Sequence, residues 1–382
     1  MWITKNKQFF YSVAALVGTM VGVGIFGLPL VFVKAGFWST TVFLVAIALV
    51  TLLSDLIYGE IVLRTKSQHQ VVGYAQLYLG PFFKKIVFFS TAFSSYAALL
   101  AYVIISGEFL TNVFPFWNLT PDTYSYIFFG IFSILVFFGI KRISWIEFML
   151  VILFIVVVIT IFFVGHTYIR SENFSSFSSL YWFLPYGVLL FAFAGAASIP
   201  MLREILTGRE YLLKRSIFWS VLIVSVLYLV FTLTVVGISG EATSPDAIKG
   251  LYEFLGDRIV FLGSLFGVIA VGVSYIMLGS SLREVFQYDY RINKFLSWLL
   301  VVVPSLILFI GGIRTFIDII SLAGAVALGL EMAVLIFIYI KAKTKGDRVP
   351  EYSLSIPRPF LYILLTMFLV GVVYALVQTP IY

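Results

Sequence analysis

MVGVGIFGLPLVF, residues 20–32, is an apolar stretch that carries four residues that weaken helices: Gly22, Gly24, Gly27 and Pro29. Glycine lets the backbone leave helical geometry at little steric cost, and Pro29 lacks an amide hydrogen and clashes with the carbonyl of Ile25. In hydrocarbon, such an interruption is tolerated only where protein or a wet cavity satisfies the freed peptide groups. If this run crosses a membrane, we predict two half-helices that meet near its middle, with residues 22–26 unwound.

The composition places the chain in a membrane. Of its 382 residues, 61% are hydrophobic and 11% are charged, and the mean hydropathy of +1.07 is far from that of a soluble domain. A helix that spans a bilayer needs about 20 apolar residues. Eleven runs approach or exceed this length, at residues 9–34, 39–63, 86–109, 124–140, 143–164, 183–206, 216–239, 260–282, 295–310, 316–340 and 360–377. We predict an all-α integral membrane protein with eleven transmembrane helices in one domain, residues 1–382.

The positions of the basic residues predict the orientation. With the amino terminus in the cytoplasm and eleven alternating crossings, 20 of the 25 lysines and arginines fall on the inner side, as the positive-inside rule requires. We therefore expect a multi-pass protein of the cell membrane, with a cytoplasmic amino terminus and an outer carboxyl terminus. The net charge of +7 then reflects topology and gives no support to a nucleic-acid partner. We expect a monomer embedded in the lipid bilayer.

Metal and thiol chemistry have little basis in this sequence. The chain contains no cysteine, which excludes disulfides, thiolate metal sites and cysteine nucleophiles. Its two histidines, His69 and His166, both fall in predicted loops. We expect no cofactor, and no metal beyond a possible Na⁺ that would be coupled to transport.

A second interruption repeats the first one. The stretch LFAFAGAASIP, residues 190–200, places Gly195 and Pro200 at the same separation as Gly24 and Pro29. It lies in the sixth predicted span, so an odd number of crossings separates the two stretches and inverts one relative to the other. Paired interruptions in two inverted halves indicate the binding site of a secondary transporter. We predict inverted repeats at residues 9–164 and 183–340, followed by an extra helix at 360–377.

The polarity of the half-helices predicts the kind of solute. The half-helix that begins near Ile25 presents free amides and the positive end of its dipole, which suit a carboxylate. The first half of the sixth span leaves carbonyls around Phe193 and Ala194, which suit an ammonium group. Neither interruption carries a charged side chain. We therefore predict transport of a zwitterionic amino acid, with a neutral side chain, by alternating access.

Several motifs, taken in order, resemble one transporter family. They are GTMVGVGIFGLP at 18–29, YGEIVLR at 58–64, GYAQLYLG at 73–80, LLAYVIISGEFL at 99–110, LLFAFAGAASIPMLREIL at 189–206 and SYIMLGSSLREVFQYD at 274–289. Together they resemble the amino acid/auxin permease family, in the amino acid–polyamine–organocation group with the LeuT-type fold. The resemblance covers nearly all of the chain and implies a five-plus-five inverted repeat in which helices 1 and 6 are broken.

The resemblance also implies the positions of the site residues. It places Gly22, Val23, Gly24 and Ile25 at the substrate carboxylate, Phe193, Ala194 and Gly195 at the opposing break, and Tyr96, Tyr275 and Ile276 on the pocket wall. It further implies a cation site formed by carbonyls of Gly18, Val21 and Ala270 with the hydroxyl of Ser274. Sodium-coupled relatives prefer a second hydroxyl at the position of Val273, so coupling to H⁺ or to Na⁺ stays open.

Three acidic residues in the spans are candidates for proton coupling. Ionisable groups inside a membrane are functional candidates by default. Glu60 lies in the YGE motif, where the resemblance favours a structural acceptor for amides of the broken helices. Asp55 and Glu331 lie deeper in their spans. Each is either a proton carrier or a neutral acid that is hydrogen-bonded within the bundle.

Two other classes of function compete with transport. GISG at residues 237–240 matches the Gly-x-Ser-Gly pattern of rhomboid-type intramembrane serine proteases, but Ser239 would need a histidine base and no predicted span contains one. An ion or solute channel would need a filter loop or a ring of charges, and neither is visible. Exchange-stimulated uptake would separate a transporter from a channel.

Overall fold

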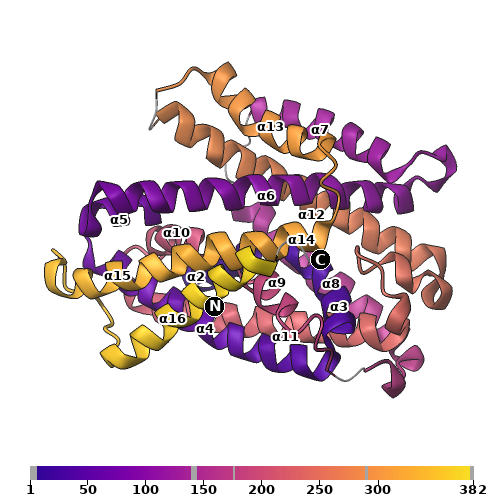
Figure 1. Cartoon of the computed structure of the whole chain (residues 1–382), viewed down its shortest axis with the longest axis horizontal. Helices are drawn as coiled ribbons and strands as arrows, with labels where there is room; N and C mark the ends of the chain where they lie inside the picture. Colours follow the sequence, from indigo (N-terminus) through magenta and orange to yellow (C-terminus); the bar gives the residue numbers. More distant parts are fainter. Residues whose placement is uncertain (1–6, 139–143, 175–176, 289–290, 379–382) are drawn as a thin grey trace.

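The computed structural model describes residues 7–138, 144–174, 177–288 and 291–378, and these residues form helices joined by short connections (Figure 1). The α-helices are α2 (Lys7–Met20), α3 (Gly24–Ala35), α4 (Phe37–Arg64), α5 (Val71–Leu79), α6 (Pro81–Val113), α7 (Pro121–Phe138), α8 (Ser144–Gly165), α9 (Leu184–Ala192), α10 (Ile199–Ile205), α11 (Leu213–Ser239), α12 (Tyr252–Tyr288), α13 (Lys294–Ile310), α14 (Phe316–Leu322), α15 (Gly329–Lys345) and α16 (Arg358–Gln378). A 3-10 segment, η4 (Ala196–Ser198), precedes α10, and a π-helical segment, η8 (Ala323–Leu328), joins α14 to α15.

The helices have the length and apolar character of membrane spans. Within the described residues, nine segments are long and apolar enough to cross a bilayer, and the pair α2 and α3 makes a tenth if it is counted as one bent span. The ninth predicted span corresponds to α13, which has 17 residues and falls below that length. The protein is therefore a multi-pass membrane protein with nine or ten such spans, and a count of eleven additionally requires α13 to cross.

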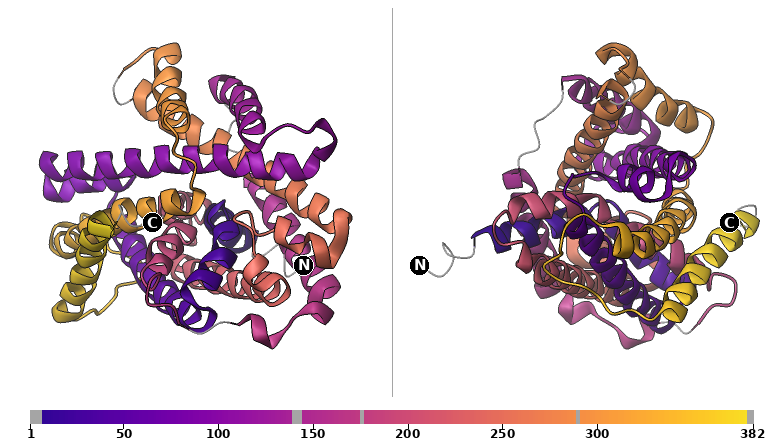
Figure 2. Two further views of the ribbon diagram at one scale, coloured as in Figure 1. Left: turned by 45° about the vertical axis from the view of Figure 1, so that its right-hand side comes forward. Right: turned by 90° about the vertical axis from the view of Figure 1, so that its left-hand side faces the viewer.

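The helices lie on two sides of α6, the 33-residue helix that crosses the molecule in Figure 1. On one side α7, α12 and α13 pack against α6 and against one another. On the other side α11 packs against α2, α3 and α4, while α9 packs against α3 and α4. Figure 2 shows the same separation from two further directions, with α16 at the edge of the molecule.

The first predicted span is two helices that meet at an angle of 56°. α2 ends at Met20 and α3 begins at Gly24, so the non-helical residues are 21–23, which we call the first break. The prediction that residues 22–26 are unwound was wrong for residues 24–26, which are helical. Pro29 is accommodated inside α3. The amide of Gly22 donates to the carbonyl of Met20 at 2.8 Å and closes the end of α2 in a tight turn.

The sixth predicted span is also interrupted. α9 ends at Ala192, residues 193–195 are non-helical, and η4 leads into α10. We call residues 193–195 the second break. The Ser198 hydroxyl donates to the carbonyl of Gly195 at 2.8 Å, which satisfies a peptide group that the interruption frees. Among the described residues, neither α3 nor α9 has a side-chain cap at its amino end.

Close backbone contact holds α9 against η8. A Cβ atom at Gly324 would overlap the carbonyl oxygen of Gly187, and one at Gly187 would overlap the carbonyl oxygen of Ser321. Small residues allow such approach between membrane helices, where packing rather than the hydrophobic effect stabilises association. The contact fixes α9, the helix that ends at the second break, to η8 in the tenth predicted span.

We expect Gly324→Ala to lower the melting temperature of the detergent-solubilised protein by several degrees, since overpacking costs about 1–3 kcal/mol. Gly130→Ala is the matched control. Gly130 is exposed on α7 and a Cβ there would meet no atom within 4 Å, so its replacement should leave melting unchanged. Equal melting temperatures for the two variants would contradict this packing.

Candidate functional site

The two breaks lie directly against each other. A Cβ atom on Gly24 would be 2.7 Å from the Cα of Ala192, and one on Gly195 would be 2.7 Å from the Cγ of Met20. The amino end of α3 therefore contacts the carboxyl end of α9, and the second break contacts the carboxyl end of α2. Glycine is required at Gly24 because a side chain there would meet the backbone of Ala192, whereas the atoms next to Gly195 belong to the flexible side chains of Met20 and Leu16.

A tyrosine from a third helix joins the ends of both helices. The hydroxyl of Tyr228 on α11 lies 2.7 Å from the carbonyl oxygen of Met20 and 2.7 Å from that of Ala192. Tyr228 is fully buried, and its ring packs on Phe193 with the centroids 5.1 Å apart. The hydroxyl thus links the last carbonyl of α2, which also accepts the Gly22 amide, to the last carbonyl of α9.

The first break is partly accessible. Val21 and Gly22 are partly exposed, and a Cβ on Gly22 would meet no atom within 4 Å. Val23, which ends the break, and Gly24 and Ile25, which begin α3, are buried. The free amides of this helix end and its dipole give the space beside Gly22 a positive potential, which suits an anionic group.

The second break combines buried and accessible residues. Phe193 and Gly195 are buried, Ala194 is partly exposed and Ala197 is exposed. The buried Phe193 ring packs on Tyr228, so the part of Phe193 that the break can offer to a solute is its backbone. Small residues here leave room for a solute, and the carbonyl end of α9 suits a cationic group.

A hydroxyl pair that the sequence analysis missed links α6 to α12. The hydroxyls of Tyr102 and Ser274 lie close enough to interact. One face of α6 carries Tyr102 and, two turns on, Phe109, whose ring meets the edge of Phe26 on α3 at 4.7 Å. The seven-residue spacing of these two aromatic residues was the signal that could have identified this face.

The three predicted wall residues have different surroundings. The Tyr96 hydroxyl donates to the Leu300 carbonyl of α13 at 2.7 Å, and the Tyr275 hydroxyl lies 3.1 Å from the Ser133 hydroxyl of α7. Both rings therefore point toward α7 and α13 and away from the breaks, because a buried phenol turns to the acceptor within its reach. Ile276 is buried on α12. The sequence placed these residues on the correct helices, but it did not predict which face of each helix they occupy.

The structure does not bring the residues of the predicted cation site together along a packed interface. Gly18 and Val21 belong to the first span, while Ala270 and Ser274 belong to α12, and all four are partly exposed. α2 and α12 pack on α8 rather than extensively on each other. The Ser274 hydroxyl lies near the Tyr102 hydroxyl. A Na⁺ site here stays a prediction.

Asp55 and Glu331 are the acids without an ion-pair partner in this region. Asp55 is fully buried on α4, and neither of its carboxyl oxygens has a hydrogen-bond partner among the described residues. Glu331 on α15 is partly exposed and accepts one long hydrogen bond, 3.4 Å, from Thr91 of α6. Both carboxyls act electrostatically on the buried Tyr58. The two acids therefore belong to one cluster between α4, α6 and α15.

Glu60 is held differently. Its carboxylate pairs with Arg64 at 2.7 Å and accepts the Leu354 amide at 2.6 Å and the Ser353 hydroxyl at 3.1 Å. These partners lie in its own helix and in the segment between α15 and α16, and not in the broken helices that the resemblance suggested. The satisfied contacts make Glu60 an anchor for that segment.

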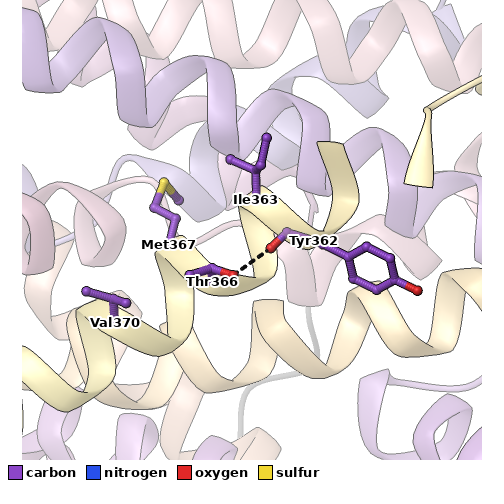
Figure 3. Close-up of a pocket in the computed structure, with 5 residues that line it drawn as sticks. All are labelled: Tyr362, Ile363, Thr366, Met367 and Val370. Carbon is purple, nitrogen blue, oxygen red and sulfur yellow. Dashed lines mark hydrogen bonds between the residues drawn. The ribbon is translucent and has the colours of Figure 1, made fainter. Parts of the chain in front are cut away.

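Ser239 and the surface hollow along α16 have no part in the site. The Ser239 hydroxyl donates to the Val235 carbonyl of its own helix at 2.8 Å and contacts Thr243. The hollow in Figure 3 lies along α16, and its lining residues are Tyr362, Ile363, Thr366, Met367 and Val370. They come from one helix and several are strongly exposed, so the hollow faces the outside of the bundle.

The contact between the breaks can be tested with two glycines. Gly24→Ala should push the second break away, lower the melting temperature and abolish uptake of labelled amino acids into cells. Gly22→Ala should keep the wild-type melting temperature, because nothing lies within 4 Å of the added methyl group. Wild-type uptake and melting in Gly24→Ala would contradict the geometry.

Comparisons with known proteins agree with this architecture. The chain is 23% identical over 288 residues to the protein described as tyrosine-specific transport system 1 of Haemophilus influenzae, covering 72% of this chain and 71% of that protein. The crystal structure of MhsT in complex with L-phenylalanine matches with a TM-score of 0.66 at 14% identity, over 97% of this chain and 98% of that one. The second likeness shows a common fold, that of a LeuT-like transporter.

The sequence pattern of the tryptophan/tyrosine permease family matches residues 5–378. The chain is thus a transporter and not an enzyme, which removes the intramembrane protease. The narrower resemblance to the amino acid/auxin permease family stays a prediction. Because the family pattern spans nearly the whole chain, the protein belongs to the tryptophan/tyrosine permease family.

Proposed function

We propose that this protein carries aromatic L-amino acids across the cell membrane by alternating access, with protons as the coupling ion. The observation that carries the proposal is the contact between the two breaks, which brings one helix amino end and two helix carboxyl ends together and leaves Gly22 and Ala194 partly exposed. The family, the tyrosine transport system and the phenylalanine complex of the structural neighbour support the aromatic class.

In this proposal, peptide groups bind both charges of the zwitterion. Amides of Val23, Gly24 and Ile25 at the start of α3 would hold the carboxylate. Carbonyls at Phe193 and Ala194 would accept the ammonium group. Opposed helix ends recognise a zwitterion without a charged side chain, and the breaks contain none. The side chain of the amino acid would then extend toward α6 and α12.

The wall that faces this side chain suits an aromatic ring. Phe26 and Phe109 already meet edge to face, and a third ring could join them in the same geometry. Tyr102 and Ser274 place hydroxyls on the same wall, where a phenol or indole group could form a hydrogen bond. Gly22 and Ala194 have little or no side chain, so they leave room for the ring.

The proposed alternating access would use the two groups of helices on either side of α6. The group with both breaks would rock against α6, α7, α12 and α13, with hinges at residues 22–24 and 194–196. We place the inverted repeats at residues 9–164 and 183–340 and the extra helix at 360–377. We also propose a monomer with a cytoplasmic amino terminus and an outer carboxyl terminus, as the basic loops indicate.

Asp55 and Glu331 are the proposed proton carriers. An ionised carboxylate that is buried without a partner is strongly disfavoured, so the neutral form of Asp55 should prevail until solvent or a cation reaches it. Glu331 has partial access to the outside of the packed core. Rocking of the helices around them would change that access and allow a proton to bind on one side and leave on the other.

The substrate class can be tested by thermal shift and by uptake into proteoliposomes. L-Tryptophan, L-tyrosine or L-phenylalanine should raise the melting temperature, since a ligand that binds the folded state stabilises it by mass action. L-Lysine and L-glutamate should not. Preloaded substrate should stimulate uptake from outside. Absence of stabilisation by all three aromatic amino acids would contradict the proposed class, and uptake without exchange stimulation would favour a channel.

The coupling can be tested with neutral replacements of the two acids. An inward pH gradient should drive accumulation in the wild type without sodium, and Asp55→Asn and Glu331→Gln should each abolish that accumulation while retaining exchange. Asp122→Asn, at an exposed ion pair with Arg314, is the control and should behave as wild type. Full pH-driven accumulation in both test variants would eliminate these carriers.

A further inference from the structure

We propose that Tyr228 is a positioning residue whose hydroxyl ties the two broken helices together and so pre-forms the amino acid site. The inference rests on the proposed function and deepens it. Tyr228 lies on α11, outside both interrupted spans, at the centre of the seventh predicted span. It touches the last residue of α2 and the last residue of α9, and each of these residues immediately precedes a break.

The Tyr228 hydroxyl has two backbone carbonyls as acceptors, one from each broken span. Both of its acceptor distances, 2.7 Å to Met20 and 2.7 Å to Ala192, are those of good O–H···O bonds. A phenol has one proton, so it can donate fully to only one of the two carbonyls at a time. The proton is therefore shared between two helix ends, each of which carries partial negative charge.

The tie has a direct consequence for the site. Met20 precedes the segment that would hold the carboxylate, and Ala192 precedes the segment that would hold the ammonium group. A link between these two carbonyls fixes the spacing of the two half-sites before the amino acid arrives. Binding to a pre-formed site loses less ordering free energy than binding to separate halves. The hydroxyl should therefore contribute to affinity more than to folding.

The packing of the ring separates the two roles. Tyr228 packs its ring on Phe193, and α11 packs along α2, α3 and α4. Tyr228→Phe keeps this ring and removes the shared proton. Tyr186→Phe is the matched control, because Tyr186 is buried on α9 and its hydroxyl has no hydrogen-bond partner within the described part of the chain. Tyr186→Phe removes a phenolic hydroxyl, as Tyr228→Phe does, but it breaks no hydrogen bond among the described residues.

The test is uptake of L-tyrosine, L-tryptophan and L-phenylalanine into proteoliposomes that contain wild type or either variant. Tyr228→Phe should raise KM at least tenfold and suppress the substrate-induced rise in melting temperature, with a smaller change in maximal rate. Tyr186→Phe should keep the wild-type KM. A wild-type KM in Tyr228→Phe, whether or not its stability falls, would overturn the inference, since a purely structural role predicts that result.

Replacement of Tyr228 by p-aminophenylalanine provides the second variant. Its amino group has two N–H donors, one for each carbonyl, and should give a KM within threefold of wild type even if Tyr228→Phe cannot be recovered folded. A tenfold higher KM in the amino variant would overturn the inference. Failure of the wild type to take up any of the three amino acids would overturn the proposed function and this inference with it. Normal wild-type uptake separates the two failures.

Discussion

A peptide group in hydrocarbon needs a hydrogen-bond partner, and the rest of this structure follows from how that requirement is met at two places. Each break frees carbonyls at the end of one half-helix and amides at the start of the next. The protein satisfies some of these groups internally, through the tight turn at Gly22, the Ser198 hydroxyl and the shared proton of Tyr228. The groups beside Gly22 and Ala194 border accessible space, and there a solute can satisfy them.

Satisfying the breaks also requires close packing around them. Gly24 lets α3 approach the backbone of Ala192, and Gly187 and Gly324 let α9 approach η8. The broken helices are thus held by backbone contacts on one side and by α11 on the other. The same constraint separates two acids: Glu60 is paired and anchors a loop, whereas Asp55 is buried without a hydrogen-bond partner among the described residues.

The sequence predicted the parts of the fold that depend on local pattern. Long apolar runs marked the spans, and the repeated Gly-to-Pro spacing marked both breaks, because glycine and proline act on the backbone wherever they occur. Boundaries were less accurate: Gly24 to Phe26 are helical, since the first turn of a helix tolerates amides without partners. The directions in which side chains point were harder to predict. Tyr96 and Tyr275 lie on the correct helices but point to α13 and α7, because helical phase and available acceptors depend on packing. Tyr228 could be noticed only as a hydroxyl at the centre of an apolar span, and its two acceptors come from distant segments.

The central claim is that peptide groups at the two breaks bind both charges of one amino acid. Equilibrium binding of L-tyrosine, tyramine and 3-(4-hydroxyphenyl)propionate to the purified protein tests it most directly, because the three ligands share a side chain and differ in their charged groups. We predict that L-tyrosine binds and that the other two, each lacking one charge, bind at least a hundredfold more weakly. Comparable affinity for tyramine or for the propionate would contradict the account.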